Sequence, residues 1–272
     1  MRTAPCLCKK RSVFLPYITY RKETVFKNYE GIIIGKCNNC GILKTFPKKR
    51  GGNFNPIVTK SKEYEKRKKE FEEMFRPIVE RILNKVKPNA KILDVGCSSG
   101  ILLSLLKQKG FEVYGLEPNK QAYAIAKKKL GKGIFNRKLS DYVRNQKVFF
   151  DCIIYNHVLE HIEKVNEEFS MIKKILRKNG ILIVGVPNTD NIIFKIRGKY
   201  WESLLPNEHV WHFSAKYLSG YLARQGFEVL NVCFEDDARK SYSFLKRIYF
   251  TILSLVNKTI GTGEAMLLLA KK

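Results

Sequence analysis

The sequence predicts an α/β fold built on a doubly wound parallel sheet, and three observations carry that prediction. Residues 92–100, Ile-Leu-Asp-Val-Gly-Cys-Ser-Ser-Gly, form a strand pattern that enters a glycine-rich turn and opens onto a helix-length apolar run. A second strand pattern ends in an acid, Glu117, 17 residues after that turn. Strand and helix patterns then alternate as far as residue 188, and this rhythm favours a parallel sheet with helices on both faces.

Four cysteines open the chain in two close pairs. They are Cys6, Cys8, Cys37 and Cys40, separated by a segment rich in strand formers. The second pair, Cys-x-x-Cys followed by glycine, has the spacing that lets two thiolates bind one tetrahedral ion, whereas the first pair is a tighter Cys-x-Cys. We therefore predict a zinc-ribbon-like module at residues 1–50 with a structural Zn²⁺, the alternative being small buried cysteines at chance spacing.

Residues 51–88 are predicted to hold a linker and an amphipathic helix. Residues 48–53 are basic and rich in glycine, as linkers often are. Within residues 60–86, apolar residues recur at intervals of three and four among Lys, Glu and Arg, and Pro77 marks a bend or break. The α/β domain is then expected over residues 89–272.

The glycine-rich turn and the acid beyond it predict a nucleoside site. Glycines let the backbone approach a ligand closely, and the helix that follows offers free N–H groups at its N-terminus. An acid at the end of the second strand, about 20 residues beyond such a turn, is placed to accept the hydroxyls of a ribose. For Glu117 this function is favoured over that of a solvated surface charge.

Further strand and helix patterns continue the rhythm. Residues 134–141 predict a short third strand that ends at Asp141, which could cap a helix or accept a hydrogen bond from an adenine amino group. Residues 148–156 are almost continuously apolar, as is typical of a buried parallel strand. A helix over residues 165–177 and a strand over residues 180–188 follow.

The C-terminal third adds an irregular segment and more elements of the sheet. Residues 187–213 are rich in aromatic residues and too irregular for a strand or long helix, so we predict a lid over the active site, with core packing as the alternative. Ser214 is expected to cap a helix, and residues 227–234 to form a sixth strand. Residues 242–256 predict an amphipathic helix on the sheet, with peripheral membrane contact as the alternative, and residues 265–270 the last strand.

The composition bounds the compartment and the partners. A hydrophobic fraction of 44% in 272 residues is ordinary for a globular protein, and neither a transmembrane run nor a secretory leader is readable. Seven cysteines without a signal peptide favour a reducing, cytoplasmic location. The net charge of +26 would attract nucleic acid, anionic lipid or acidic metabolites, but it consists mostly of scattered lysines, which fits lysine-rich coding or heat adaptation equally well.

Together these motifs resemble those of the class I S-adenosylmethionine-dependent methyltransferases. The matching segments are Leu-Asp-Val-Gly-Cys-Ser-Ser-Gly, Leu-Glu-Pro-Asn, Phe-Asp-Cys-Ile-Ile-Tyr-Asn-His-Val-Leu-Glu-His-Ile and Leu-Arg-Lys-Asn-Gly-Ile-Leu-Ile-Val, in that order. The N-terminal cysteines, with residues 207–214 and 222–229, look like the small-molecule subgroup called methyltransferase domain 23. The resemblance covers essentially the whole chain and implies a Rossmann-like seven-stranded methyltransferase sheet with S-adenosylmethionine as cofactor.

The resemblance also implies a cofactor site. Its residues would be Asp94, Gly96, Cys97 and Gly100 on the methionine and ribose side, Glu117 at the ribose hydroxyls, Asp141 at the adenine and Asn156 at the end of the fourth strand. The family more often has glycine where this chain has Ser98, whose Cβ restricts φ. A dinucleotide-dependent oxidoreductase, the competing function for such a sheet, would need a Gly-x-Gly-x-x-Gly turn that this sequence lacks.

All four histidines lie in two clusters, His157 with His161 and His209 with His212. Methyl transfer from a sulfonium is an in-line displacement, so the protein aligns the acceptor and removes its hydroxyl proton, a task that suits histidine. We predict that one of the four is the base, the alternative being hydrogen-bonded core histidines. The segment His157-x-x-Glu160-His161 is also similar to the Glu-x-x-Glu-His segment associated with a divalent cation in quinone-biosynthesis O-methyltransferases, but histidine replaces the first acid here.

Three functions compete. The first is methylation of an oxygen, or less readily a nitrogen or carbon, of a small-molecule acceptor such as a sugar, lipid precursor or quinone-like ring, with residues 187–213 covering the acceptor. The second is an RNA methyltransferase that grips phosphate with the basic surface and the zinc ribbon, although the fourth motif lacks the Asn/Asp-Pro-Pro-aromatic signature of base amino methylation. The third is a non-catalytic scaffold that depends on the cofactor.

Overall fold

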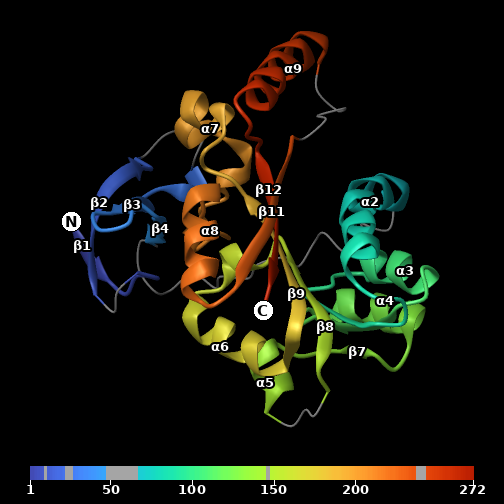
Figure 1. The fold of residues 1–272 in the computed structure, drawn as a ribbon. Coiled ribbons are helices and arrows are strands. Elements are labelled where there is room, and N and C mark those ends of the chain that lie inside the picture. The colour runs from blue at the N-terminus through green and yellow to red at the C-terminus, as the bar shows by residue number, and fades with distance from the viewer. Residues whose placement is uncertain (9–10, 22–26, 47–66, 145–147, 237–242) are drawn as a thin grey trace. The chain divides into compact units, whose positions relative to one another are not determined.

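The computed structural model describes most of the chain (Figure 1): residues 1–8, 11–21, 27–46, 67–144, 148–236 and 243–272. The predicted linker at residues 48–53 and the start of the predicted helix at residues 60–86 lie outside these ranges.

The larger sheet has seven strands, which are β5 (Lys91–Val95), β6 (Glu112–Leu116), β7 (Ile134–Phe135), β8 (Phe150–Asn156), β9 (Leu176–Pro187), β11 (Glu228–Glu235) and β12 (Ala265–Lys271). Their order in space is β11-β12-β9-β8-β5-β6-β7. β5 is parallel to both neighbours, and β6 is parallel to β7. The chain thus starts near the middle of the sheet, runs outward to β7 and returns to the other side of β5 at β8, which confirms the doubly wound fold.

One helix of this α/β part, α2, precedes β5, and the others alternate with the strands along the chain. The helices are α2 (Lys68–Lys85), α3 (Ile101–Gln108), α4 (Lys120–Leu130), α5 (Leu139–Val143) and α6 (Val165–Ile175), with the short 3₁₀ helix η2 (Leu159–His161) after β8. The central strands are apolar on both sides because helices cover both faces: Ile92 and Leu93 in β5 and Ile153 and Ile154 in β8 are fully buried.

Two predicted boundaries are wrong. The strand predicted to run to Asp141 ends at Phe135, and Asp141 lies inside the first turn of α5, whose N-cap is Lys138. Leu139 and Tyr142 bury side chains three positions apart, which fits a helical turn and not a strand. The helix predicted to reach residue 177 ends at Ile175, because β9 begins at Leu176. Two residues of β9 are hydrogen-bonded to the last residue of the chain: the Asn179 N–H donates to the Lys272 carbonyl, and the Gly180 carbonyl accepts from the Lys272 N–H.

A second sheet has five strands in the order β1-β2-β3-β4-β10, all antiparallel to their neighbours. They are β1 (Arg2–Ala4), β2 (Ser12–Thr19), β3 (Ile33–Cys37), β4 (Leu43–Phe46) and β10 (Trp211–His212), with the 3₁₀ helix η1 (Lys27–Tyr29) between β2 and β3. Four strands come from the predicted ribbon, but β10 belongs to the predicted lid. Sequence analysis missed β10 because two residues have no periodicity to read.

The remaining elements lie in the C-terminal third. They are α7 (Ile192–Arg197), the 3₁₀ helices η3 (Gly198–Tyr200) and η4 (Glu202–Leu204), α8 (Ala215–Arg224) and α9 (Phe244–Thr259). The predicted cap of α8 is confirmed, since the Ser214 side chain accepts from the Tyr217 N–H at 3.1 Å. Trp201 and Trp211 are buried, as core packing requires, while the lid function of their segment stays a prediction.

The chain forms two compact units. The first comprises Met1–Phe54, Leu159–Val165 and Gly185–Leu268, and the second comprises Asn55–Val158, Asn166–Val184 and Leu269–Lys272. The domain boundaries drawn from the sequence stay a prediction. Among the described helices, none has the length and apolar character needed to cross a membrane.

Candidate functional site

The turn between β5 and α3 is closed by the end of β6. The N–H groups of Gly96 and Cys97 donate to the Leu116 carbonyl at 2.7 and 3.1 Å. Gly96 has a φ of +79°, and a Cβ there would lie 2.5 Å from Cγ2 of Val158, so only glycine fits without rearrangement. Ser98 also adopts a left-handed conformation, with a φ of +49°, so the turn forms despite its Cβ.

Glu117 lies at the end of β6 with its carboxylate held against this turn. Oε2 accepts from the Ser98 N–H at 2.9 Å, and Oε1 accepts from the Asn119 N–H at 2.7 Å. Burial raises the pKa of Glu117, and these two N–H groups oppose that effect. Because each carboxylate oxygen has a second acceptor position, the fixed group can still accept hydrogen bonds from two ligand hydroxyls.

Asp94 is buried at the end of β5. Burial, followed by the nearby charge of Glu117, raises the pKa of Asp94 to about 8. In the sheet register Asp94 pairs with Gly115 of β6 and Ile154 of β8, so the ends of three neighbouring parallel strands meet at this edge. Ligands of open α/β sheets bind beyond the carboxyl ends of such strands.

The predicted cofactor residues are placed as follows. Asp94, Gly96, Cys97, Gly100 and Glu117 come together around the β5–α3 turn. Asn156 is half-buried at the end of β8, on the same edge. Asp141 is exposed on α5, which follows β7. The structure therefore brings together the residues predicted for the methionine and ribose side and leaves Asp141 on a separate element.

Two asparagines that sequence analysis did not assign support Glu117. The Asn119 side chain caps α4 by accepting from the N–H groups of Gln121 and Ala122, both at 3.0 Å. The Asn136 side-chain amide donates to the Glu117 carbonyl at 2.8 Å. A Pro-Asn pair before a helix is a recognisable cap signal, whereas Asn136 acts on backbone atoms far away in sequence and leaves no such signal.

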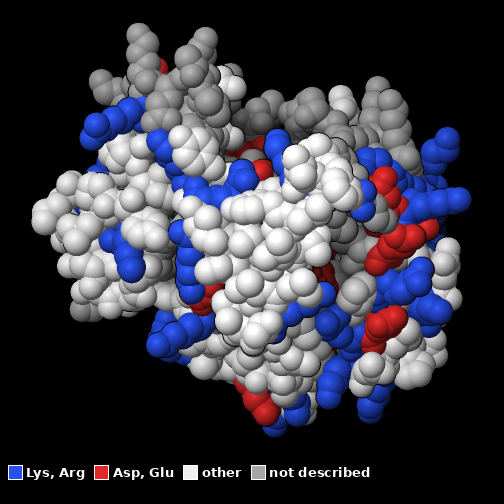
Figure 2. Space-filling view, turned by 90° about the horizontal axis from the view of Figure 1, so that it is seen from above, with Lys and Arg blue, Asp and Glu red and all other residues white. Residues whose placement is uncertain are grey.

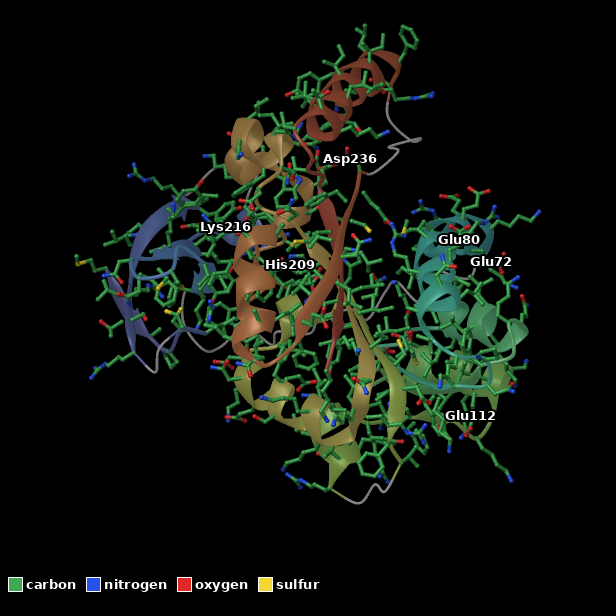
Figure 3. The ribbon with its side chains drawn as sticks, in the orientation of Figure 1. Glu72, Glu80, Glu112, His209, Lys216 and Asp236 are labelled. Carbon is green, nitrogen blue, oxygen red and sulfur yellow. The ribbon has the colours of Figure 1, made fainter. Side chains whose placement is uncertain are left out.

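Three of the four histidines converge with Glu160 in the first compact unit (His209 is labelled in Figure 3). The ring centroids of His161 and His209 are 4.8 Å apart, and those of His209 and His212 are 6.2 Å apart. Atoms of Glu160, His161 and His209 that could bind a metal lie within 4.8 Å of one another. This arrangement can share a proton or hold a divalent cation. His157 is exposed, directly after β8, with a φ of +54°.

His161 has a defined tautomer. Its Nδ1 lies 2.9 Å from the carbonyl oxygen of Glu208. A carbonyl only accepts, so Nδ1 must carry the proton and the lone pair of the neutral ring is on Nε2. The Val210 N–H donates to the Glu160 carbonyl at 2.8 Å, which ties η2 to the residues before β10.

His212 has a different environment. It is buried, and its Nε2 lies 2.8 Å from Oγ1 of Thr45 on β4. Burial, followed by the charge of His209, lowers the pKa of His212 to about 3. The ring is therefore neutral and hydrogen-bonded at physiological pH, as a core histidine would be. Thr45 was not identified from the sequence because 167 residues separate the partners.

The four N-terminal cysteines form one cluster of free thiols. Sγ of Cys6 lies 3.7 Å from that of Cys40 and 3.4 Å from that of Cys8, and Sγ of Cys8 lies 3.9 Å from that of Cys37. Disulfide sulfurs would be about 2.05 Å apart. Two thiolates on a tetrahedral Zn²⁺ with bonds of about 2.3 Å are about 3.8 Å apart, so the cluster fits that ion.

Known proteins similar in sequence are methyltransferases and related enzymes. Residues 66–232 match the family model described as a methyltransferase domain. A ubiquinone biosynthesis O-methyltransferase of Pelagibacter ubique is 30% identical over 58% of this chain and 66% of its own length. A carboxy-S-adenosyl-L-methionine synthase of Campylobacter hominis is 33% identical over 39% of this chain and 47% of its own length. The chain thus spans less than two thirds of the length of these relatives.

Solved structures share the fold at low identity. A SAM-dependent methyltransferase from Archaeoglobus fulgidus has a TM-score of 0.53 at 18% identity, covering 74% of this chain and 94% of its own. A magnesium protoporphyrin IX methyltransferase from Synechocystis, solved with bound SAM, has a TM-score of 0.51 at 14% identity, covering 80% of this chain and 86% of its own.

Proposed function

The chain belongs to the class I S-adenosylmethionine-dependent methyltransferases, and from this premise we propose that it methylates an oxygen of a small-molecule acceptor. The cofactor supplies an electrophilic methyl group on a sulfonium. The observation that carries the proposal is the carboxylate of Glu117, fixed by backbone N–H groups beside the Gly96 turn. The name of the Pelagibacter relative, an O-methyltransferase of ubiquinone biosynthesis, supports oxygen as the acceptor atom.

The residues proposed to hold the cofactor are Asp94, Gly96, Cys97, Gly100, Glu117, Asp141 and Asn156. They suit this ligand for two reasons. The turn at Gly96 has no Cβ that would keep a ligand from the backbone. The carboxylate of Glu117 offers two oxygens of fixed orientation, which is what a pair of ribose hydroxyls needs.

The cofactor site is tested by Glu117→Gln. The amide keeps the size of the side chain but loses the charge, so binding of S-adenosylhomocysteine, measured by calorimetry, should weaken about tenfold or more. Glu112→Gln is the matched control, because Glu112 is exposed at the other end of the same strand (Figure 3) and should bind as the native chain does. Native affinity in Glu117→Gln would contradict the proposed site.

We further propose that His161, of the four predicted histidines, is the general base. His161 is half-buried rather than enclosed, and its Nε2 carries the lone pair. His212 is unsuited because it is buried with a lowered pKa. The ligand atoms of Glu160, His161 and His209 lie within 4.8 Å of one another, so the carboxylate of Glu160 can stabilise the positive charge that forms when His161 takes a proton.

The base is tested with methyl-labelled cofactor and hydroxylated acceptors, including quinone precursors, sugars and lipid precursors. His161→Ala should lower kcat by about 10² or more and flatten its pH profile, with S-adenosylhomocysteine affinity unchanged. His157→Ala, at an exposed position, is the control and should keep near-native turnover. Turnover lost on chelation and restored by Mg²⁺ would instead assign Glu160, His161 and His209 to a cation.

We also propose that Cys6, Cys8, Cys37 and Cys40 bind one Zn²⁺. Support comes from four sulfurs at the separations that tetrahedral coordination requires. Four thiolates leave no open position on the ion, so its role would be structural and separate from methyl transfer.

A further inference from the structure

Helix α9 exposes a broad apolar side. Its buried residues are Phe250, Leu253 and Asn257. The large apolar residues that are exposed on it or at its end are Phe244, Leu245, Ile248, Tyr249, Ile252, Leu255, Val256 and Ile260. Because a helix advances about 100° per residue, these side chains form one continuous stripe on a different side from the buried residues. A continuous exposed apolar surface often marks an interaction site.

The helix is firmly anchored, so the stripe is a fixed surface. Asn257 is fully buried, its Oδ1 accepts from the Ile192 N–H at 2.9 Å, and its Nδ2 donates to Asp236 at 2.9 Å. The Ser254 hydroxyl donates to the other oxygen of Asp236 at 2.6 Å (Asp236 is labelled in Figure 3). These bonds tie the second half of α9 to the start of α7 and to the residue that follows β11.

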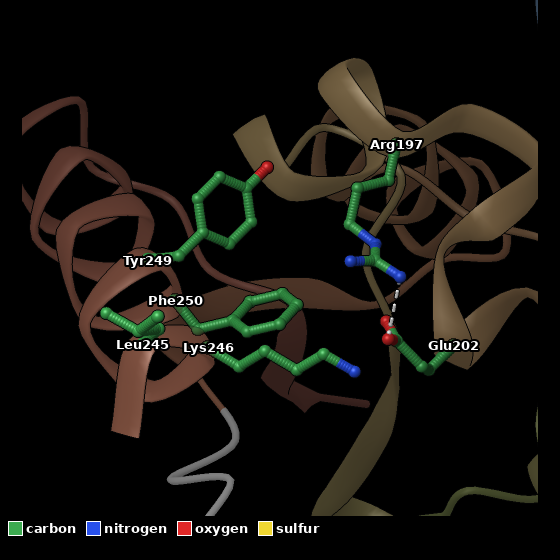
Figure 4. A pocket seen from close by; sticks show the side chains of 6 residues that line it. All are labelled: Arg197, Glu202, Leu245, Lys246, Tyr249 and Phe250. Atoms are coloured by element: carbon green, nitrogen blue, oxygen red, sulfur yellow. Dashed lines mark hydrogen bonds and ion pairs between the residues drawn. The ribbon is translucent and has the colours of Figure 1, made fainter. Parts of the chain in front are cut away.

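Basic side chains border the stripe. α9 contains Lys246, Arg247 and Lys258 and no acidic residue. Near the N-terminus of α9, Lys246 and Arg197 line a hollow together with Glu202 and apolar residues of the helix (Figure 4). The Arg197 guanidinium lies 5.1 Å from the centre of the Phe250 ring and pairs with Glu202 at 2.9 Å. Figure 2, seen from the side on which α9 lies, shows a white area with blue residues at its margin.

We propose that α9 docks the protein on an anionic lipid surface. An amphipathic helix with an apolar stripe and flanking Lys and Arg lies in the plane of a membrane interface, and cations near anionic headgroups strengthen its binding. A second copy of the chain is a poorer partner, since it would bring like charges together on a chain of net charge +26. The surface is independent of the proposed methyl transfer and would deliver the enzyme to acceptors at the membrane.

The proposal is tested by sedimenting the full chain with vesicles. Binding is expected to phosphatidylcholine vesicles that contain phosphatidylglycerol, not to phosphatidylcholine alone, and should weaken with added salt. The double variant Leu245→Glu/Ile252→Glu should lower binding about tenfold or more. The matched control is Met74→Glu/Leu83→Glu on α2, with the same change of charge at exposed apolar positions, and it should bind nearly as the native chain does.

A fluorescence arm reports insertion directly. Trp201 and Trp211 are buried, whereas Phe244 is 74% exposed, so Phe244→Trp adds one tryptophan on the stripe. Its emission should shift to the blue with anionic vesicles and stay unchanged with neutral ones. Equal binding by both double variants, or no binding by the native chain, would overturn the proposal. So would a dimer in sedimentation velocity that Ile252→Glu dissociates, without any vesicle binding.

Discussion

Asp94 and Glu117 put two buried carboxyl groups at the ends of neighbouring strands. Backbone N–H groups hold the carboxylate of Glu117, whereas burial keeps Asp94 protonated near neutral pH, with a pKa of about 8. Because their surroundings differ, Glu117 carries the negative charge near neutral pH and Asp94 is mostly neutral. The edge of the sheet therefore presents one fixed acceptor, Glu117, and one group whose charge depends on pH.

This difference predicts a pH dependence of stability. The pKa of Asp94 rises from 3.8 to about 8 on folding, so the folded chain binds more protons than the unfolded chain between these values. The stabilisation from this proton is complete below pH 3.8 and is lost as the pH rises through about 8. From pH 5 to pH 9, the melting temperature without cofactor should fall further in the native chain than in Asp94→Asn, by roughly 5 °C.

The contribution of Asp94 is the difference between two curves of melting temperature against pH, one for the native chain and one for Asp94→Asn. Burial also raises the pKa of Glu117 and Glu168, which act in the same direction in both proteins. Differential scanning fluorimetry across the pH series measures the difference. Parallel curves would show that Asp94 ionises in the folded chain as it does in the unfolded one.

Sequence reasoning located Glu117 because its position depends on spacing along the chain. It did not distinguish the histidines, because what separates them is contributed by distant residues. Thr45 lies against His212, and the carbonyl of Glu208 sets the tautomer of His161. A hydrogen bond to a backbone carbonyl leaves no pattern in the sequence, so the tautomer of His161 could not be predicted from the sequence.

At the level of elements, the cysteine cluster joins the β1–β2 segment to the β3–β4 turn. None of the three residues of β1 is buried, so a metal at this junction would be a large part of the stability of that strand. We expect one zinc per chain by mass spectrometry, and a melting temperature that falls by at least several degrees when a strong chelator removes it.

Cysteine variants show which thiols are involved. Cys37→Ser should reduce zinc content by at least half, because three thiolates hold the ion less tightly than four. Cys233→Ser is the control, since Cys233 lies on β11 outside the cluster, and its zinc content should stay native. Full zinc occupancy in Cys37→Ser would show that the ion binds elsewhere.

The anchor of α9 makes a separate prediction. Asn257→Ala removes the acceptor of the Ile192 N–H and a donor to Asp236 in a fully buried place. Leaving such groups without partners costs about 1 to 3 kcal/mol, which denaturant unfolding would measure. Thr259→Ala, at an exposed position of the same helix, should change stability by under about 0.5 kcal/mol. A loss that small in Asn257→Ala would contradict the anchor.

Elements with strong periodicity were predicted, and those that depend on tertiary contacts were not. β5, α3 and β8 follow from apolar patterns in their own residues. β10 exists because Trp211 and His212 pair with Lys44 and Leu43, and the Lys44 ammonium lies 4.6 Å from the Trp211 ring. Nothing in residues 211–212 alone distinguishes them from a loop, so their partner strand decides their conformation.

Across the whole molecule, sequence motifs predicted the large sheet but not the composition of the compact units. The motifs lie within about 100 residues, and their order along the chain fixes the topology. The first unit combines Met1–Phe54 with Gly185–Leu268. These segments are held together by contacts between residues far apart in the sequence. An example is the hydrogen bond from Trp201 Nε1 to Glu264 at 2.7 Å, which no local sequence pattern predicts.

The net charge of +26 is also a property of the whole molecule, and it predicts how strongly the protein binds RNA and how that binding depends on salt. Lys and Arg are scattered along the sequence, so we expect few of them to reach one RNA strand together. On the face seen in Figure 2 they lie at several separate places. Binding should then be non-specific: measurable by filter binding at about 50 mM salt, and weakened by at least tenfold at about 200 mM. No methyl group should be incorporated into RNA at either salt concentration.

An RNA methyltransferase would behave differently. A dedicated phosphate-binding surface would keep its own RNA tightly bound at the higher salt concentration, even in the presence of unrelated RNA, and that RNA would become methylated. The result shows whether the excess positive charge serves RNA recognition. Scattered lysines attract RNA only through the long-range electrostatic field, which salt screens, whereas a dedicated surface adds direct contacts that salt does not abolish.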